Sequence, residues 1–185
     1  MDYRKRIEAL QKTLEQFFAD RGNLFARFCE AALERLQDDG KILVFGNGGS
    51  AAQAQHFAAE LVNKFLIERQ PIPCISLTTD TSTLTAIAND VSFDDVFSRQ
   101  VEALGRKGDV VLGLTTSGNS PNVIKAILCA KKLGLLTAVL TGEGGGEVGS
   151  LADYCLDVPS KYTPLIQEVH LILLHFLAEE VEKRK

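Results

Sequence analysis

The stretch KILVFGNGGSAAQAQHFAAELVNKF, residues 41–65, decides the fold. Residues 42–45 form an unbroken apolar run, which is typical of a strand buried on both faces of a parallel sheet. A short turn follows that is poor in side chains and consists of Gly46, Asn47, Gly48 and Gly49. Ser50 is a favourable N-cap, and the alanine-rich sequence after it favours a helix. A strand, a glycine loop and a helix N-terminus bring backbone N–H groups together, which suits an anion and above all a phosphate.

The helix predicted after this loop carries His56 and Glu60 on one face, with Gln53 three residues before His56. An imidazole and a carboxylate at this spacing can share a divalent metal ion or a proton. The alternative is an ordinary pair of surface side chains. At about 1.5 Å per residue the pair lies roughly 9–15 Å from the helix N-terminus, a distance that a sugar phosphate can span.

Short apolar runs alternate with helical patterns through the middle of the chain. The predicted strands are residues 42–45, 74–77, 110–114, 136–140 and 154–158. This alternation predicts an α/β fold, a three-layer doubly wound parallel sheet with right-handed crossovers. Ligands bind such sheets at the carboxyl ends of the strands, where the loops 46–50 and 115–120 are expected to lie.

Residues 2–37 show helical spacing of apolar side chains, with Gly22 as a possible break between two N-terminal helices. These helices carry no catalytic side chains, so we expect them to serve packing or oligomerisation. Residues 38–185 then form the α/β core of a single domain, 1–185. Within this core we expect the glycine-rich segment 142–149 to be a flexible connection, because Glu143 and Glu147 would repel a phosphate.

Composition limits the partners and the compartment. The net charge of -4 and the absence of a basic face argue against nucleic acid as a ligand. No apolar stretch is long enough to cross a membrane, and residues 1–6 lack the apolar core of a signal peptide. The four cysteines form no C-x-x-C motif and lie in apolar surroundings, which indicates reduced thiols in a cytoplasmic protein.

The segment TTSGNS, residues 115–120, follows the third predicted strand and precedes Pro121, a favourable first residue of a helix. It offers the hydroxyl groups of Thr115, Thr116, Ser117 and Ser120. Hydroxyls and backbone amides at a helix N-terminus can hold a phosphate without a lysine. The segment is not a nucleotide P-loop, because it lacks G-x-x-x-x-G-K. An ordinary capped turn is the alternative.

The predicted C-terminal helix, residues 165–183, carries Gln167, Glu168, His170 and His175. Gln167 and His175 lie about 12 Å apart along the axis and about 80° apart around it. They can meet one ligand only by leaning toward each other, or one of them serves the site of a neighbouring subunit. His170 points elsewhere and is expected to be a packed or supporting histidine.

Together these motifs resemble the sugar isomerase (SIS) family and, more narrowly, its bacterial heptose-phosphate isomerases. The resemblance rests on GNGGSAAQAQHFAAEL, the AND at 88–90, TSGNSPNVIKA and IQEVH, and it runs from about residue 5 to the end. It implies a flavodoxin-like SIS fold. It also implies isomerisation of sedoheptulose 7-phosphate to D-glycero-D-manno-heptose 7-phosphate, the first step of ADP- or GDP-heptose biosynthesis for surface polysaccharide such as lipopolysaccharide.

The resemblance also implies the site residues and the assembly. It implies a homotetramer with sites at subunit interfaces and one zinc ion per subunit, held by His56, Glu60, Gln167 and His175. The implied substrate contacts are Asn47, Gly48, Gly49, Ser50, Glu60, Asn89, Asp90, Thr115, Thr116, Ser117, Ser120 and Gln167. In this hypothesis Glu60 is the catalytic base, moving a proton between C1 and C2 through an enediol, and His175 is the catalytic acid.

The sequence departs from the family pattern at three places. Gln53 stands where these isomerases commonly have Asp, Thr163-Pro164 stands where an Asp and a basic residue are common, and Thr115 replaces a Ser. The exact sugar phosphate is therefore less well defined than the reaction. Two alternatives stay open: an isomerase of another sugar phosphate, and a non-catalytic SIS-fold regulator that binds the replication initiator. Such regulators typically lack counterparts of Glu60 and His175, so the presence of both favours an enzyme.

Overall fold

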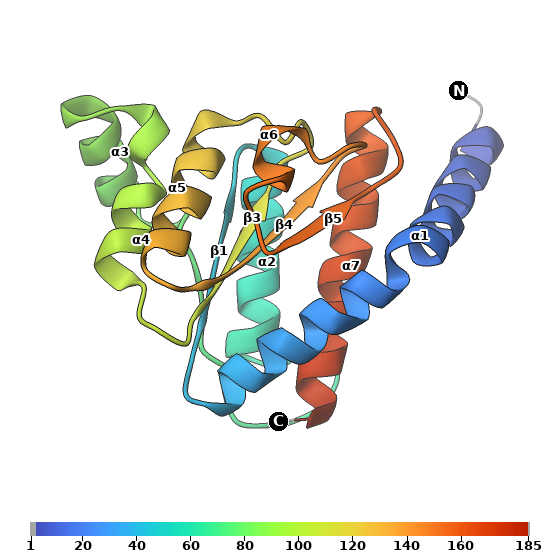
Figure 1. Ribbon diagram of the computed structural model, residues 1–185. Helices are drawn as coiled ribbons and strands as arrows, with labels where there is room; N and C mark the ends of the chain where they lie inside the picture. Colours follow the sequence, from blue (N-terminus) through green and yellow to red (C-terminus); the bar gives the residue numbers. More distant parts are fainter. Residues whose placement is uncertain (1–2, 185) are drawn as a thin grey trace.

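The computed structural model describes residues 3–184 and has a parallel five-stranded sheet at its centre (Figure 1). The strand order is β2-β1-β3-β4-β5, and every neighbouring pair is parallel. The strands are β1 (Ile42–Gly46), β2 (Cys74–Ser76), β3 (Val110–Leu114), β4 (Leu136–Thr141) and β5 (Tyr154–Asp157). Each lies within two residues of its predicted position. The central strands β1 and β3 are buried at every residue, and such strands give apolar runs that are easily recognised.

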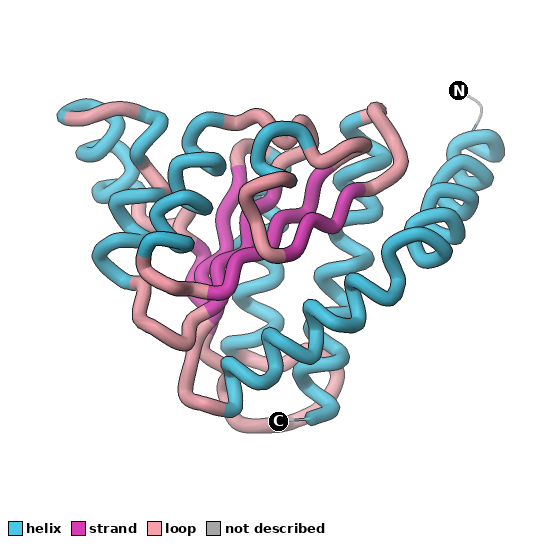
Figure 2. The backbone as a smooth tube through the Cα atoms, in the orientation of Figure 1, coloured by secondary structure: helices cyan, strands magenta, loops and turns pink. Residues whose placement is uncertain are grey.

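Helices cover both faces of the sheet, so the predicted three-layer α/β architecture is confirmed (Figure 2). One layer consists of α1 (Tyr3–Gln37), α2 (Gly49–Val62) and α7 (Thr163–Arg184). The other contains α3 (Thr81–Asp90), the 3-10 turn η1 (Phe93–Asp95), α4 (Ser98–Leu104), α5 (Pro121–Lys132) and the short α6 (Gly146–Gly149). The predicted helix over 93–104 is thus split into a turn and a separate helix.

Side chains of successive strand residues enter two different cores. In β1, Ile42 and Val44 pack with α1, α2 and α7, whereas Leu43 and Phe45 pack with α4 and α5. All four are completely buried. This alternation follows from the two-residue period of a strand. Because all the strands are parallel, their carboxyl ends lie along one edge of the sheet.

The N-terminal segment forms one continuous helix, α1, so the expected break at Gly22 is wrong. A single glycine costs a helix only about 1 kcal/mol, and good helix formers and buried aromatic side chains lie on both sides of it. Phe17 and Phe25 flank Gly22 and pack edge to face with ring centroids 6.5 Å apart. The helix packs along α7 and β5, as Figure 1 shows.

Among residues 3–184, no helix is long and apolar enough to cross a membrane. The four cysteines are free thiols, of which Cys29 and Cys74 are buried in the core. Burial raises the pKa of both thiols well above the usual range, so they are protonated and unreactive at neutral pH. This agrees with the prediction that the cysteines form no disulfides.

Candidate active site

The two predicted phosphate loops lie side by side at the carboxyl edge of the sheet. β1 and β3 are neighbours, with Gly46 opposite Leu114 in the register, so the loops that follow them start from adjacent positions. The side-chain amides of Asn47, in the first loop, and Asn122, in the first turn of α5 after the second loop, are joined by two reciprocal hydrogen bonds of 2.9 Å. Asn47 was expected to contact substrate. Its amide is engaged in this link, which fixes the spacing of the loops.

The start of α2 differs from the prediction that Ser50 caps it. The N-cap is Gly48, whose φ of 54° is easily reached only by glycine, and Ser50 is a buried residue inside the helix. The chain also turns closely at Gly46, where an added Cβ would lie 2.7 Å from the Leu114 carbonyl oxygen. The glycines thus start the helix two residues earlier than a serine cap would, and Gly48 and Gly49 remain exposed at its N-terminus.

The second loop brings three of its hydroxyl groups together. The Thr115 hydroxyl lies 3.1 Å from that of Ser120 and 3.4 Å from that of Ser117. Ser117 also accepts a hydrogen bond from the Asn119 N–H at 3.1 Å. The loop leads into α5, which begins at Pro121 as predicted, so these hydroxyls surround a helix N-terminus that favours an anion.

The glycine-rich segment 142–149 packs against this second loop and includes α6, so describing it as a plain connection was wrong. The Val148 N–H donates to the Gly118 carbonyl at 3.0 Å, and the Glu147 N–H donates to the Asn119 side chain at 2.9 Å. A Cβ on Gly118 would lie 2.1 Å from the Gly145 carbonyl oxygen. The two backbones are in contact because neither glycine has a side chain. Segment 142–149 therefore packs against the second loop and holds it in place.

His56, Glu60 and His175 form a second cluster, farther along α2. His56 Nε2 lies 2.9 Å from His175 Nε2 and 3.5 Å from Glu60 Oε1. His56 and Glu60 lie one turn apart on α2, whereas His175 comes from the facing surface of α7. The side chains of His56 and Glu60 are 45% and 21% exposed, so the cluster is open to a ligand.

The surroundings of His175 favour its neutral form. Burial, and to a smaller degree the nearby His56, lower its pKa, while Glu60 acts in the opposite direction. The Phe65 ring stacks on the imidazole with centroids 5.3 Å apart and planes 24° apart. A neutral imidazole held in this way can exchange a proton with a substrate oxygen near neutral pH.

Gln167 lies nearer the start of α2, against Gly49. A Cβ on Gly49 would lie 2.7 Å from Gln167 Nε2, so the amide end of Gln167 packs directly on the backbone at the start of α2. Gln53 donates a 2.6 Å hydrogen bond to the Gln167 carbonyl oxygen, while its own Oε1 is buried without a partner. Gln53 therefore positions the turn of α7 that carries Gln167, a role that its sequence position alone did not reveal.

The donor set has the chemistry of a zinc site but is not arranged as a finished one. Within the described residues, no group of three or more His, Cys, Asp or Glu side chains is placed to hold a metal ion. Two imidazole ligands of tetrahedral zinc lie about 3.3 Å apart, slightly farther than the two Nε2 atoms here. The donor types themselves, two imidazoles and a carboxylate, are ones that zinc binds.

Asn89 and Asp90 are not brought to these clusters. They end α3, are exposed, and are joined to each other by a 2.7 Å hydrogen bond. In Figure 1, α3 and α7 lie on opposite sides of the molecule with β1 and α2 between them. Within one chain, these two residues therefore lie apart from Gln167 and His175.

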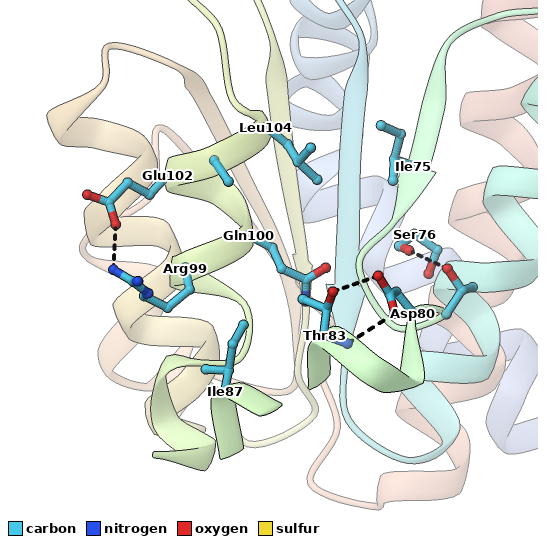
Figure 3. Close-up of a pocket in the computed structure, with 11 residues that line it drawn as sticks. Ile75, Ser76, Asp80, Thr83, Ile87, Arg99, Gln100, Glu102 and Leu104 are labelled. Atoms are coloured by element: carbon cyan, nitrogen blue, oxygen red, sulfur yellow. Dashed lines mark hydrogen bonds and ion pairs between the residues drawn. The ribbon is translucent and has the colours of Figure 1, made fainter. Parts of the chain in front are cut away.

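A cavity of about 710 Å³ beside β2 is distinct from both clusters (Figure 3). It lies between α3 and α4 and is lined by none of the predicted site residues. Its polar groups bond within the chain: Asp80 caps α3 through the Thr83 N–H, and Gln100 donates to two backbone carbonyls. The cavity therefore offers few free polar groups to a phosphate.

His170 is completely buried, as the prediction of a packed histidine requires. Its Nε2 lies 3.0 Å from the Thr141 carbonyl oxygen, which accepts the hydrogen bond, and its Nδ1 is buried without a partner. Burial lowers the pKa of His170 to about 4, with the Thr141 carbonyl acting in the opposite direction. The folded protein therefore holds His170 neutral where an unfolded chain would protonate it.

This difference predicts a pH-dependent stability. The unfolded chain binds a proton at His170 below about pH 6.5, so the free energy of unfolding should fall as the pH drops from 6.5 to 4, by about 3 kcal/mol in all. His170→Gln keeps a donor for Thr141 but does not titrate. Urea unfolding of both proteins should show this extra decrease only in the wild type, and parallel curves between pH 4 and 7 would contradict it.

Three further residues were missed from the sequence: Asn122, Phe65 and Glu182. Asn122 pairs with a residue 75 positions away, and no local pattern reports such a contact. Phe65 follows the end of α2 and gives no sign of its stacking on His175. Glu182 did give a signal, because a carboxylate near a helix C-terminus opposes the helix dipole and needs a partner.

The fold and the two loops define a class, a domain that binds phosphosugars at the carboxyl edge of a parallel sheet. The SIS domain family model matches residues 3–142. The phosphoheptose isomerase of Desulfovibrio desulfuricans is 53% identical over 165 residues, which span 89% of this chain and 79% of that protein. The phosphoheptose isomerase of Geobacter sulfurreducens is 48% identical and spans 99% of this chain and 97% of its own length.

A solved structure agrees. The phosphoheptose isomerase of Neisseria gonorrhoeae superposes with a TM-score of 0.89 at 41% identity, covering 98% of this chain and 99% of that one. The chain belongs to the phosphoheptose isomerase family of SIS-domain proteins. It is therefore an enzyme of the aldose–ketose isomerase class.

Proposed function

We propose that this protein interconverts sedoheptulose 7-phosphate and D-glycero-D-manno-heptose 7-phosphate in the cytoplasm, as the first step of heptose biosynthesis for surface polysaccharide. The observation that carries the proposal is the Glu60–His56–His175 cluster next to two loops suited to a phosphate. The high identity of the phosphoheptose isomerases to this chain supports the same substrate. The whole chain, residues 1–185, acts as one SIS domain.

The residues divide the work between anchoring and proton transfer. The phosphate is held by the loops 46–50 and 115–120, and Gln167 beside Gly49 contacts the sugar. Glu60 removes a proton from C1 of the ketose and returns one to C2, with an enediol between the two steps. His175, neutral because burial lowers its pKa, moves the proton of the substrate oxygens.

The direct test is incubation of the purified protein with sedoheptulose 7-phosphate, followed by NMR of the sugar. The signals of the aldose phosphate should appear and reach equilibrium. Fructose 6-phosphate is the matched control substrate, a shorter ketose with the same carbonyl position. If fructose 6-phosphate is converted faster than the heptulose, the alternative of a different sugar phosphate is correct.

The phosphate anchor predicts a binding defect in Ser120→Ala. The change removes one hydroxyl of the loop and leaves the helix start intact, because Pro121 still begins α5. A charge-assisted hydrogen bond contributes roughly 1–3 kcal/mol, so KM should rise by about tenfold while kcat changes little. Ser98→Ala is the control, since the Ser98 hydroxyl bonds to Asp95 in the preceding η1 turn, away from both loops. An unchanged KM in Ser120→Ala would place the phosphate elsewhere.

We infer in addition that His56, Glu60, Gln167 and His175 hold one zinc ion per subunit, which when bound polarises the substrate carbonyl. Gln167 must swing from Gly49 toward the histidines to complete the set. Metal analysis should find about one equivalent per chain, and chelation should lower the rate. His56→Ala should lose both metal and activity, whereas His170→Gln, which changes the buried histidine, should keep both. Full activity in metal-free protein would contradict this role.

We infer a homotetramer whose sites lie at subunit interfaces. The position of Asn89 and Asp90 supports this, because they are exposed at the end of α3, on the other side of the molecule from α7, where the surface of another copy could reach them. Exposed aromatic side chains on α1 and α7 supply an apolar surface, with Phe18 and Phe176 packed edge to face at 5.7 Å. Light scattering that gave a monomer mass at micromolar concentration would contradict the assembly.

A further inference from the structure

Arg69 and Glu182 form a buried ion pair beside the proposed catalytic cluster. Their side chains are only 5% and 3% exposed, and Arg69 Nε lies 3.3 Å from Glu182 Oε1. A charge pair this deeply buried is costly to desolvate and adds little stability by itself. The other hydrogen bonds of Arg69 and Glu182 therefore indicate the structural role of the pair.

The Arg69 guanidinium closes the end of α2. Its Nη2 donates to the Glu60 carbonyl oxygen at 2.7 Å, and its Nη1 donates to the Leu61 carbonyl oxygen at 2.8 Å. Carbonyls in the last turn of a helix have no partner within the helix, and a cation there also suits the helix dipole. Arg69 thus fixes the turn of α2 that carries Glu60.

The Glu182 carboxylate fixes the segment that follows. It accepts hydrogen bonds from the Phe65 N–H at 2.9 Å and from the Leu66 N–H at 2.7 Å. Burial raises its pKa, but these backbone N–H groups and Arg69 outweigh burial, so the pKa of Glu182 lies below its usual range. The ionised carboxylate holds Phe65 in place, and the Phe65 ring stacks on His175.

We propose that the Arg69–Glu182 pair positions the active site by holding the last turn of α2, with Glu60, and the Phe65 ring, with His175, in one rigid unit. Neither residue touches the substrate, so both are positioning residues. The inference rests on the proposed roles of Glu60 and His175. The inference goes beyond those roles, because it says that residues outside the cluster, in the loop after α2 and near the end of α7, fix the positions of the base and the acid.

The test compares Glu182→Gln with Asp109→Asn. Asp109 is also a buried carboxylate that accepts two backbone N–H bonds, from Lys41 at 3.0 Å and Arg106 at 2.7 Å, and that pairs with the Lys41 ammonium. It precedes β3, at the amino edge of the sheet. Both changes swap a carboxylate for an amide of the same shape, so both should lower the free energy of unfolding.

Only Glu182→Gln should change catalysis. A misplaced base or acid lowers the rate of the chemical step, so kcat should fall by about tenfold or more while KM stays within about twofold. Arg69→Lys keeps a positive charge beside Glu182 but loses the two guanidinium nitrogens that bond both helix carbonyls. If Glu182→Gln does not fold, Arg69→Lys should show the same lower kcat with a nearly unchanged KM. Equal kcat losses in Glu182→Gln and Asp109→Asn, at equal folded fraction, would overturn the proposal.

A second readout does not depend on activity. The chain has three histidines, so their side-chain NMR signals can be assigned individually. In Glu182→Gln, the loss of Phe65 stacking should shift the His175 signals and leave those of the buried His170 unchanged. In Asp109→Asn, the His175 signals should not shift. Unmoved His175 signals would overturn the positioning role. A wild type without isomerase activity would instead refute the proposed function, and the NMR comparison would still decide the role of the pair.

Discussion

Replacing Glu60 with Gln is expected to lower the isomerase turnover number by about 10³-fold, which lies within the usual contribution of a general base. Gln has the shape of Glu but cannot accept a proton from carbon. Glu60 lies 3.5 Å from His56 and its side chain is 21% exposed, so it faces both the cluster and a ligand. The sugar phosphate should still bind, because its anchor lies in the loops at the start of α2 and α5.

The matched control is Glu68→Gln, a change of the same kind in the loop after α2. The Glu68 side chain is 83% exposed and its carboxylate pairs with Lys64, so turnover should stay at the wild-type value. Steady-state kinetics and the melting temperature of all three proteins complete the comparison. If Glu60→Gln keeps full turnover while remaining folded, Glu60 is not the base.

Gly118→Ala is expected to have the largest effect on structure. Gly118 has a φ of 68°, and an added Cβ would lie 2.1 Å from the Gly145 oxygen and 2.8 Å from the Gly146 Cα. These are backbone atoms, so one of the two glycine segments must move. We expect the free energy of unfolding to fall by about 3 kcal/mol or more, and substrate binding to be lost with the displaced hydroxyls of the loop.

Gly134→Ala separates the contact from the backbone strain. Gly134 has nearly the same φ, 70°, but nothing lies within 4 Å of its added Cβ. This variant should lose only the roughly 1–2 kcal/mol that a left-handed conformation costs an L-residue, and its KM should be unchanged. Urea unfolding and kinetics of both variants provide the measurement. Equal losses in the two would show that segment 142–149 does not support the loop.

The sequence allowed the sheet to be predicted well because its central strands β1 and β3 are fully buried apolar runs and the two loops start at their carboxyl ends. The errors arose at glycines, where the local sequence pattern reports neither the backbone conformation that the chain adopts nor the packing of the helix. Gly48, not Ser50, starts α2, since a glycine with positive φ allows an earlier turn. Gly22 does not interrupt α1, because packing on α7 outweighs one poor helix former.

The site was predicted in part. Spacing on one helix was sufficient to pair His56 with Glu60, the family resemblance joined His175 to them, and in the structure the three side chains lie together. Contacts between distant segments were beyond the sequence, as with Asn47 and Asn122, which pair across two loops. The position of Gln167 was also beyond the sequence, because its place beside Gly49 depends on how α7 packs against α2.

The central claim is that Glu60 moves a proton between C1 and C2 of sedoheptulose 7-phosphate. It is tested most directly by running the reaction in heavy water through many turnovers and measuring deuterium in the aldose product by NMR. The wild type should yield aldose with solvent-derived deuterium at C2, because a proton held by Glu60 exchanges with solvent, and Glu60→Gln should yield almost none. Aldose formed by the wild type without any deuterium, or equal labelling by Glu60→Gln, would contradict the account.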